Sequence, residues 1–328
     1  MKILIADKFE QPGLDALNKL GCDVIFEPDL TTDDLPAALK KHDPKVLIVR
    51  STKVPEPVLE AAGELGLIIR AGAGFDTIDI AAAGTRGIAV CNCPGMNSTA
   101  VAELAWGFIV GFDRRIPQQT QELREGKWAK KAWAKFGRGL KGRTLGLIGV
   151  GQIGKLVARR GIAFEMKVLY HDIIPCEELD NHPDARRVSL EDVLKQSDFV
   201  SLHVPSIPAT KHMINAQTLA LMKKDAVLVN TTRGAVVDQA ALTKALKDGT
   251  IAGACLDVYE DEPKAEDKTI SQEILSLPNF IGTHHVGAST EQAQLAVAEE
   301  TVRIVKHFMD AGEGVNIVNA EALAAATS

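Results

Sequence analysis

The chain has 328 residues, of which 46% are hydrophobic, and a formal net charge of -6. This length exceeds what one ordinary core fills, so we expect two α/β domains, and the apolar content excludes an intrinsically disordered chain. The negative charge argues against a general affinity for nucleic acid or acidic lipid, because both require a concentrated positive surface.

The cysteines are odd in number and scattered along the chain, at Cys22, Cys91, Cys93, Cys176 and Cys255. This pattern is typical of reduced thiols in a cytoplasmic protein rather than of a disulfide framework. Cys91 and Cys93 have no second pair to complete a metal site, so we predict none. The N-terminus is a short apolar strand without a signal peptide's apolar length, and no apolar segment reaches membrane-spanning length.

Short apolar runs alternate with helical patterns from residue 2 to about residue 95, which predicts a parallel sheet. The expected strands are 3–6, 24–26, 46–49, 67–69 and 88–91. Arg50 and Arg70 directly follow two of these runs, where the ligands of such sheets gather. Either arginine alone is equally well explained by a side chain that reaches water at a strand end. Together, and with Lys53 beside the first, they favour a pocket for an anionic substrate.

A Pro-Gly loop before Asn97 leads into a helix from about Ala100, with Ser98 or Thr99 as its cap. Residues 101–112 are apolar nearly all round this helix. Such a helix favours burial on every side, through an interdomain or subunit contact, so we expect at least a homodimer built partly on it.

Residues 127–143 hold seven Lys or Arg and no acidic residue, with Trp128, Trp133 and Phe136 among them. Nucleic-acid binding is one interpretation, but a single short basic segment in an acidic protein favours a solvated loop. A third interpretation is a positive rim that steers an anionic substrate. We expect no nucleic-acid partner.

The strongest motif begins with the apolar run 145–148, which reads as a buried parallel strand, and continues through Gly149, Gly151 and Gly154. Such glycines let the backbone turn sharply and approach a pyrophosphate, and the following helix offers its N-terminus to that anion. Asp172 stands eighteen residues after Gly154, at the end of the next apolar run. Its carboxylate can accept hydrogen bonds from ribose hydroxyls and would repel the extra phosphate of NADP, so the motif predicts NAD.

The alternation then resumes, with strands expected at 199–203, 226–230, 253–257 and 280–284, followed by one amphipathic helix at 291–309. Because the remaining tail is short, we expect no further regulatory domain. Polar residues end each strand. They are Thr231 to Arg233, Asp257 with Glu262 shortly after it, and His284 with His285.

Hydride transfer to a carbonyl needs a proton donor, and His285 suits this role because imidazole titrates near neutral pH. An ionised Glu262 can hold the imidazole oriented and stabilise its charged form. Arg233 can grip a substrate carboxylate in a fork and polarise the adjacent carbonyl. Taken singly, a surface arginine, a capping glutamate and a core histidine are the simpler interpretations.

These motifs together resemble the D-isomer-specific 2-hydroxyacid dehydrogenases over about residues 3–320, and most of all the D-3-phosphoglycerate dehydrogenases in a short form without the C-terminal regulatory domain. The blocks that carry the resemblance, besides the glycine motif through Asp172, are VRS at 49–51, RAGAG at 70–74, NS at 97–98, GKW at 126–128, TRGAVVD at 232–238, LDVYEDEP at 256–263 and HVGAST at 285–290.

The resemblance implies an α/β fold of two Rossmann-like, flavodoxin-like parallel-sheet domains. The NAD-binding domain, 98–287, would be inserted into a substrate domain formed by 1–97 and 288–328. The implied catalytic residues are Arg233, Glu262 and His285. The implied NAD-binding residues are Gly149, Gly151, Gln152, Ile153, Gly154, Asp172, Pro205, Thr231, Thr232, Gly287 and Asp257, the last beside the nicotinamide. The implied substrate-binding residues are Arg50, Ser51, Lys53, Arg70, Ala71, Gly72 and Asn97.

The implied reaction interconverts a D-2-hydroxy acid and its 2-keto acid, with 3-phosphoglycerate, the substrate that leads to serine, favoured by the basic residues near Arg50. Reduction of hydroxypyruvate or glyoxylate is the main alternative, because the chain looks one residue shorter after Ser51 than typical phosphoglycerate enzymes. A binding protein like the NAD-sensing corepressors is a remote alternative. His284 replaces a usual proline, and we expect it to point away from His285 because consecutive strand-end side chains alternate. Homodimer and homotetramer both stay open.

Overall fold

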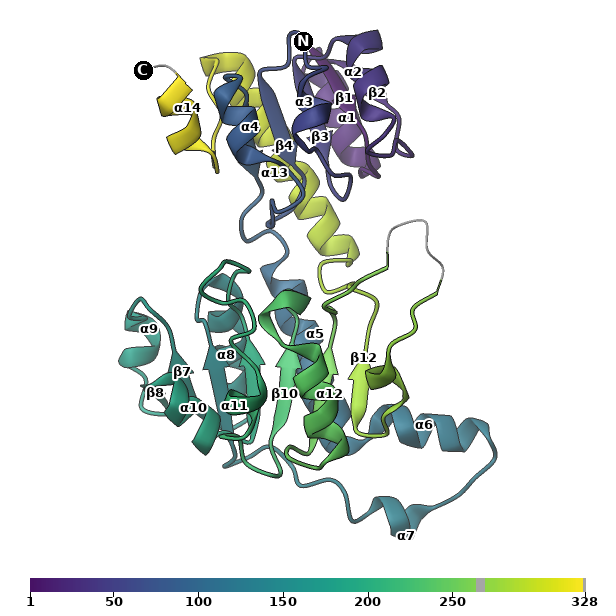
Figure 1. The fold of residues 1–328 in the computed structure, drawn as a ribbon, viewed down its shortest axis with the longest axis vertical. Helices are drawn as coiled ribbons and strands as arrows, with labels where there is room; N and C mark the ends of the chain where they lie inside the picture. Colours follow the sequence, from purple (N-terminus) through teal and green to yellow (C-terminus); the bar gives the residue numbers. More distant parts are fainter. Residues whose placement is uncertain (264–268, 327–328) are drawn as a thin grey trace. The chain divides into compact units, whose positions relative to one another are not determined.

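The computed structural model describes residues 1–263 and 269–326, which form two compact units (Figure 1). Unit 1 comprises Met1–Asn97 and Ser289–Ser328, and unit 2 comprises Ser98–Ala288. The chain therefore leaves unit 1 after its N-terminal part and returns to it near the C-terminus.

Unit 1 is built on a five-stranded parallel sheet with the order β2-β1-β3-β4-β5. Its strands are β1 (Lys2–Ile5), β2 (Asp23–Phe26), β3 (Val46–Val49), β4 (Leu67–Arg70) and β5 (Ala89–Asn92). Its helices are α1 (Gln11–Lys19), α2 (Leu35–His42), α3 (Glu56–Leu59), α4 (Ile80–Thr85), α13 (Glu291–Ala311) and α14 (Ala320–Ala326). Every residue of β3 is buried, because side chains from both faces of the sheet enter hydrophobic cores. All five strands coincide with expected apolar runs to within one residue at each end.

The short helix α14 was not expected from the sequence, since its alanines show no apolar periodicity. It packs on α4 at Gly84, where an added Cβ would lie 2.3 Å from Cβ of Ala322. A glycine at this point is what lets the two helices approach.

Unit 2 is built on a seven-stranded parallel sheet with the order β12-β11-β10-β9-β6-β7-β8. Its strands are β6 (Thr144–Ile148), β7 (Lys167–His171), β8 (Ala185–Arg187), β9 (Phe199–Leu202), β10 (Val227–Asn230), β11 (Gly253–Leu256) and β12 (Phe280–Gly282). Its α-helices are α5 (Ser98–Arg114), α6 (Ile116–Arg124), α7 (Lys130–Trp133), α8 (Gln152–Ala163), α9 (Glu177–Asp180), α10 (Leu190–Gln196), α11 (Ala216–Leu219) and α12 (Gln239–Lys247), and the 3₁₀ turns η1 (Gly234–Val236) and η2 (Glu273–Ser276) complete it. The two parallel sheets confirm the predicted fold class.

The apolar helix α5 differs from the expectation that another domain or subunit covers it. Trp106, Phe108 and Ile109 are buried in the core of unit 2 itself, and the Trp106 indole donates a hydrogen bond to the Val157 carbonyl of α8. The exposed part of α5 is a narrow stripe that includes Glu103. Burial within its own unit explains the apolar sequence without a subunit contact.

Among the described residues, no helix combines the length and the hydropathy needed to cross a membrane.

The basic segment 127–143 lies on a projecting arm that carries α6 and α7 (Figure 1). Several of its cations pair with acidic groups of the same unit: Lys141 lies 2.5 Å from Glu165, and Arg138 pairs with Asp225. Arg143 is nearly buried and bonds Asp113 at 2.9 Å. These pairs interrupt the positive surface that binding of nucleic acid or steering of an anionic substrate would need.

Candidate active site

The candidate residues of unit 2 lie at the carboxyl edge of its sheet. Gly149 and Asp172 follow the neighbouring strands β6 and β7, while Arg233, Asp257 and His285 follow β10, β11 and β12. The strand order reverses between β9 and β6, and open parallel sheets bind their ligands at such a point, beyond the carboxyl ends of the strands. One edge therefore holds both the glycine loop and the reactive side chains.

The glycine loop fits a dinucleotide, because each of its three glycines has the local geometry that this cofactor requires. Gly149 has a left-handed φ of 88°, and a Cβ there would lie 2.6 Å from the His203 carbonyl oxygen. At Gly154 a Cβ would lie 2.3 Å from the Gly149 carbonyl oxygen, so helix and strand could not pack closely. Around Gly151 the space is open within 4 Å, which leaves room for a pyrophosphate. Gln152 and Ile153 open α8, whose N-terminus has no side-chain cap.

Asp172 is held by the glycine loop and by its own turn. One carboxylate oxygen accepts from the Val150 amide at 2.7 Å and the other from the Ile174 amide at 3.0 Å. Arg187, the last residue of β8, donates to the Asp172 carbonyl at 2.8 Å. Arg187 could not be predicted from the sequence, because β8 is a short strand without an apolar run.

The other residues expected on the cofactor side follow β9 and β10. Pro205 is exposed, and Thr232 bonds the Asn230 side chain at 2.7 Å. The Thr231 hydroxyl is buried, and among the described residues it has no hydrogen-bond partner. Such a group is available to a ligand at this edge.

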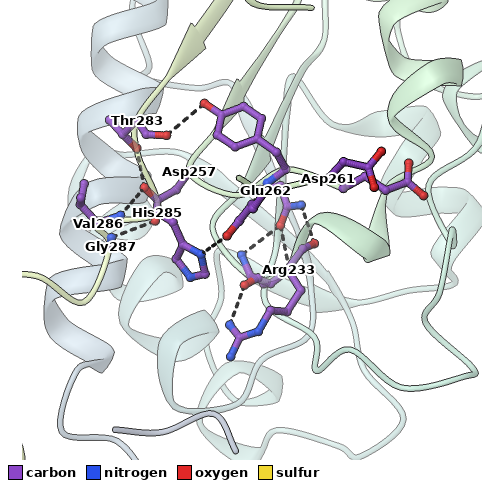
Figure 2. Close-up of polar contacts among 12 residues, drawn as sticks. Arg233, Asp257, Asp261, Glu262, Thr283, His285, Val286 and Gly287 are labelled. Atoms are coloured by element: carbon purple, nitrogen blue, oxygen red, sulfur yellow. Dashed lines mark hydrogen bonds and ion pairs between the residues drawn. The ribbon is translucent and has the colours of Figure 1, made fainter. Parts of the chain in front are cut away.

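The two acid–base candidates are paired. His285 Nδ1 lies 2.7 Å from Glu262 Oε2, and Figure 2 shows the imidazole turned toward that carboxylate. The other oxygen, Oε1, accepts from the Tyr259 amide at 3.1 Å. Burial acts to raise the pKa of Glu262, but the His285 hydrogen bond and charge, the Tyr259 amide and the Arg233 charge outweigh it, so this pKa lies below its ordinary value. Glu262 is therefore a carboxylate at neutral pH.

Arg233 comes from the adjacent strand end, and its Nη1 donates to the Thr232 carbonyl at 2.8 Å. Its charge acts on Glu262. The structure thus brings together Arg233, Glu262 and His285, which are far apart in the sequence, within one unit (Figure 2).

Asp257 anchors the loop that carries His285. Its buried carboxylate accepts from the Thr283 hydroxyl at 2.5 Å, the Val286 amide at 2.9 Å and the Gly287 amide at 2.8 Å (Figure 2). The His285 amide also donates to the Asp257 carbonyl at 2.8 Å. A carboxylate has about four acceptor sites, so most of this one is used inside the protein.

The strand alternation expected for His284 and His285 does not apply, because β12 ends at Gly282 and both histidines lie in the turn after it. His285 has a left-handed φ of 54°, uncommon for a residue with a Cβ. This conformation, rather than strand alternation, sets the direction of the His285 side chain.

In unit 1, the expected substrate residues also lie at a carboxyl sheet edge. Arg50 follows β3 and is partly buried, while Ser51 and Lys53 are exposed. Asp7, after β1, accepts from the amides of Arg50 at 2.6 Å and of Ser51 and Thr52 at 3.1 Å each. This role of Asp7 was not predicted from the sequence. The Asp7 carboxylate fixes this loop, and it accepts hydrogen bonds from backbone amides that could otherwise donate to a bound anion.

Arg70 ends β4, and its guanidinium lies against Gly72, where a Cβ would be 1.6 Å from Nη1. Gly72 therefore leaves the space that this side chain occupies. Ala71 is buried, and Asn97 ends the N-terminal part of the unit with its carboxamide oxygen buried and unbonded among the described residues.

Comparisons with known proteins agree with the motifs. The family model described as "D-isomer specific 2-hydroxyacid dehydrogenase, NAD binding domain" matches residues 106–287. The chain is 40% identical over 321 residues to D-3-phosphoglycerate dehydrogenase of Methanocaldococcus jannaschii, covering 97% of this chain and 59% of that protein. It is 42% identical over 297 residues to hydroxypyruvate reductase of Thermotoga maritima, covering 90% of this chain and 93% of that protein. The chain thus spans less than two thirds of the first relative and nearly all of the second.

Solved structures share the fold. The NADPH-dependent glyoxylate/hydroxypyruvate reductase of Sinorhizobium meliloti, solved with NADP and malonate, is 31% identical, covers 98% of this chain and 97% of its own, and superposes with a TM-score of 0.84.

Proposed function

Since the chain belongs to the D-isomer specific 2-hydroxyacid dehydrogenases, we propose that it interconverts a D-2-hydroxy acid and its 2-keto acid with NAD. The observation that carries this proposal is the His285–Glu262 pair, with a 2.7 Å hydrogen bond, beside Arg233 and on the same sheet edge as the glycine loop. Unit 2 is then the NAD-binding domain and unit 1 the substrate domain.

The three side chains have distinct roles. Because Glu262 engages Nδ1 of His285, the imidazole exchanges its proton with the substrate oxygen at Nε2. Glu262 stays ionised and stabilises the imidazolium that precedes reduction. Arg233 grips the substrate carboxylate and polarises the adjacent carbonyl oxygen. When bound, NAD supplies the hydride donor or acceptor.

We propose 3-phosphoglycerate and 3-phosphohydroxypyruvate, and hence a role in serine biosynthesis, as the favoured pair. Three cations on unit 1 support this choice: Arg50, Lys53 and Arg70. The similarity to the Methanocaldococcus relative also supports it. Hydroxypyruvate or glyoxylate is the alternative. It is supported by the Thermotoga relative, which the chain covers almost completely, and by Asp7, whose carboxylate occupies the amides of residues 50–52.

A panel of 2-keto acids assayed with NADH tests the proposal. We expect 3-phosphohydroxypyruvate to give the highest kcat/KM, and equal or better use of hydroxypyruvate would transfer the assignment to the alternative. No turnover on any acid, together with intact NADH binding, would instead revive a corepressor-like binding protein.

We also infer a homodimer or homotetramer, now from the arm rather than from α5. Large apolar side chains are exposed there: Trp128 is 81% exposed, Leu123 57% and Phe136 51%. A cluster of this kind marks an association surface in many proteins. Light scattering of the protein and of Trp128→Ser tests the oligomeric state, and a stable, active monomer would refute this inference.

The five cysteines are free and buried, which supports a reducing compartment such as the cytoplasm.

A further inference from the structure

Glu260 is the centre of a side-chain cluster that lies outside the proposed catalytic and cofactor-binding residues. It lies two residues before Glu262 and employs both carboxylate oxygens. Oε1 lies 2.5 Å from His212 Nε2, and Oε2 accepts from the Gln239 amide at 3.2 Å. The Glu260 amide in turn donates to the Gln239 side-chain oxygen at 3.1 Å. The side chains of His212 and Glu260 are only 37% and 30% exposed, so this is more than a loose surface pair.

His212 is itself fixed before it meets Glu260. Its amide donates to the Ala235 carbonyl at 2.8 Å, and its carbonyl accepts from the Asn215 side chain at 2.9 Å. These bonds hold it at a left-handed φ of 49°. His212 lies in the segment that follows β9 and Pro205, and Glu260 lies in the segment that follows β11. The contact between His212 and Glu260 therefore connects these two segments.

The same turn rests directly on the segment that follows Arg233. A Cβ at Gly234 would lie 1.8 Å from the Tyr259 carbonyl oxygen and 2.5 Å from the Glu260 nitrogen. Only a glycine allows this approach. The Tyr259 amide in turn donates a hydrogen bond to Glu262 Oε1 at 3.1 Å. Displacement of the turn would therefore move the group that orients Glu262.

We propose that Glu260 is a positioning residue, which with His212 and Gln239 fixes the turn 259–262 so that Glu262 meets His285. This inference rests on the proposed roles of Glu262 and His285 in proton transfer. An exposed ion pair contributes little, but here one carboxylate joins three segments that border the reactive edge. Misplacement of a reacting group by about 1 Å is enough to lower a rate by roughly 100-fold.

The test compares Glu260→Ala with Asp261→Asn, which removes the same charge from the neighbouring exposed residue of the same turn. We expect Glu260→Ala to lower kcat by about 10- to 100-fold on the best keto acid, with NADH affinity retained, and Asp261→Asn to be nearly neutral. Glu260→Gln keeps an acceptor for the Gln239 amide, so it should retain more activity. If Glu260→Ala does not fold, Glu260→Gln and His212→Gln replace it, and each should show a smaller loss of kcat in the same direction.

The pH profile distinguishes positioning from a general loss of structure. Glu260→Ala should move the reductive profile in the direction that Glu262→Gln moves it, and His212→Ala should add little in the Glu260→Ala background. If Glu262→Gln shifts the profile and Glu260→Ala only lowers thermal stability, the positioning role is wrong. Should Glu262→Gln itself leave the profile unchanged, the proposed roles of Glu262 and His285 fail first. Equal effects of Glu260→Ala and Asp261→Asn would also overturn the inference.

Discussion

The pairing of Glu262 with His285 predicts how the reduction depends on pH. In the proposed reaction the His285 imidazole donates a proton to the substrate, so the rate of reduction falls as pH rises. The negative charge of Glu262 favours the protonated imidazole. In Glu262→Gln the fall should therefore come at lower pH, while much of the maximal rate survives. Because the pKa of Glu262 is depressed, its carboxylate is ionised at neutral pH and becomes protonated only as pH falls through that depressed value.

The size of the shift follows from the geometry of the pair. The Nδ1–Oε2 distance is 2.7 Å, but the side chains of His285 and Glu262 are 46% and 34% exposed, so water screens part of the attraction. A charge-assisted hydrogen bond in this setting is worth about 1 to 2 kcal/mol. Since 1.36 kcal/mol corresponds to about one pH unit, we expect the descending limb to move by roughly one unit.

The assay is NADH oxidation with the best keto acid across the pH range, for the unsubstituted protein and for Glu262→Gln, His285→Ala and His284→Ala. His285→Ala should lose about 100- to 10,000-fold in kcat while NADH affinity stays nearly intact, and His284→Ala should be mild. An unmoved limb in Glu262→Gln would refute the coupling. Equal damage from the two histidine substitutions would mean that His284 is the proton donor.

Three further outcomes can be measured on the same protein. Arg233→Lys should raise KM and lower kcat together in steady-state assays, because an ammonium keeps the charge but loses the fork, and a change in KM alone would contradict the polarising role. The unsubstituted protein should have a much higher kcat/KM with NADH than with NADPH, and comparable values with both cofactors would contradict the role of Asp172. Asp172→Ser should reduce this preference, because it removes the carboxylate and Arg187 lies beside the backbone carbonyl of residue 172. Asp257→Ala should destabilise the protein by about 1 to 3 kcal/mol in thermal unfolding, because it leaves buried donors of the His285 loop without their acceptor, and an unchanged Tm would argue against this anchoring.

The elements that sequence reasoning found are those whose evidence is local. Buried parallel strands such as β3 appear as continuous apolar runs, and the residues after them mark the functional edge of the sheet. The polar edge strand β8 and the alanine-rich α14 have no such pattern, so their existence depends on packing against distant partners.

Contacts between segments distant in sequence were beyond local reasoning. Asp7 reaches the loop at Arg50 across more than forty residues, and His212 meets Glu260 across 48. The residues next to Asp7 and His212 in the sequence show no pattern that predicts these partners. The all-round apolar pattern of α5 was identified correctly, but its partner was not, since a pattern specifies burial without specifying what provides it.

The three-donor anchor at Asp257 has a consequence for the motion of the turn that carries His285. Loop amides normally exchange with solvent deuterium quickly, because loops open at small free-energy cost. The amides of Val286 and Gly287 instead donate to the carboxylate of Asp257, a residue that is only 1% exposed. We expect both to exchange at rates close to those of the strands. His285, the proposed proton donor, would then lie on a segment that opens only with the core of unit 2. The exposed loop at Ser51 and Lys53, where we propose that substrate binds, is therefore the better place for substitutions intended to change substrate range.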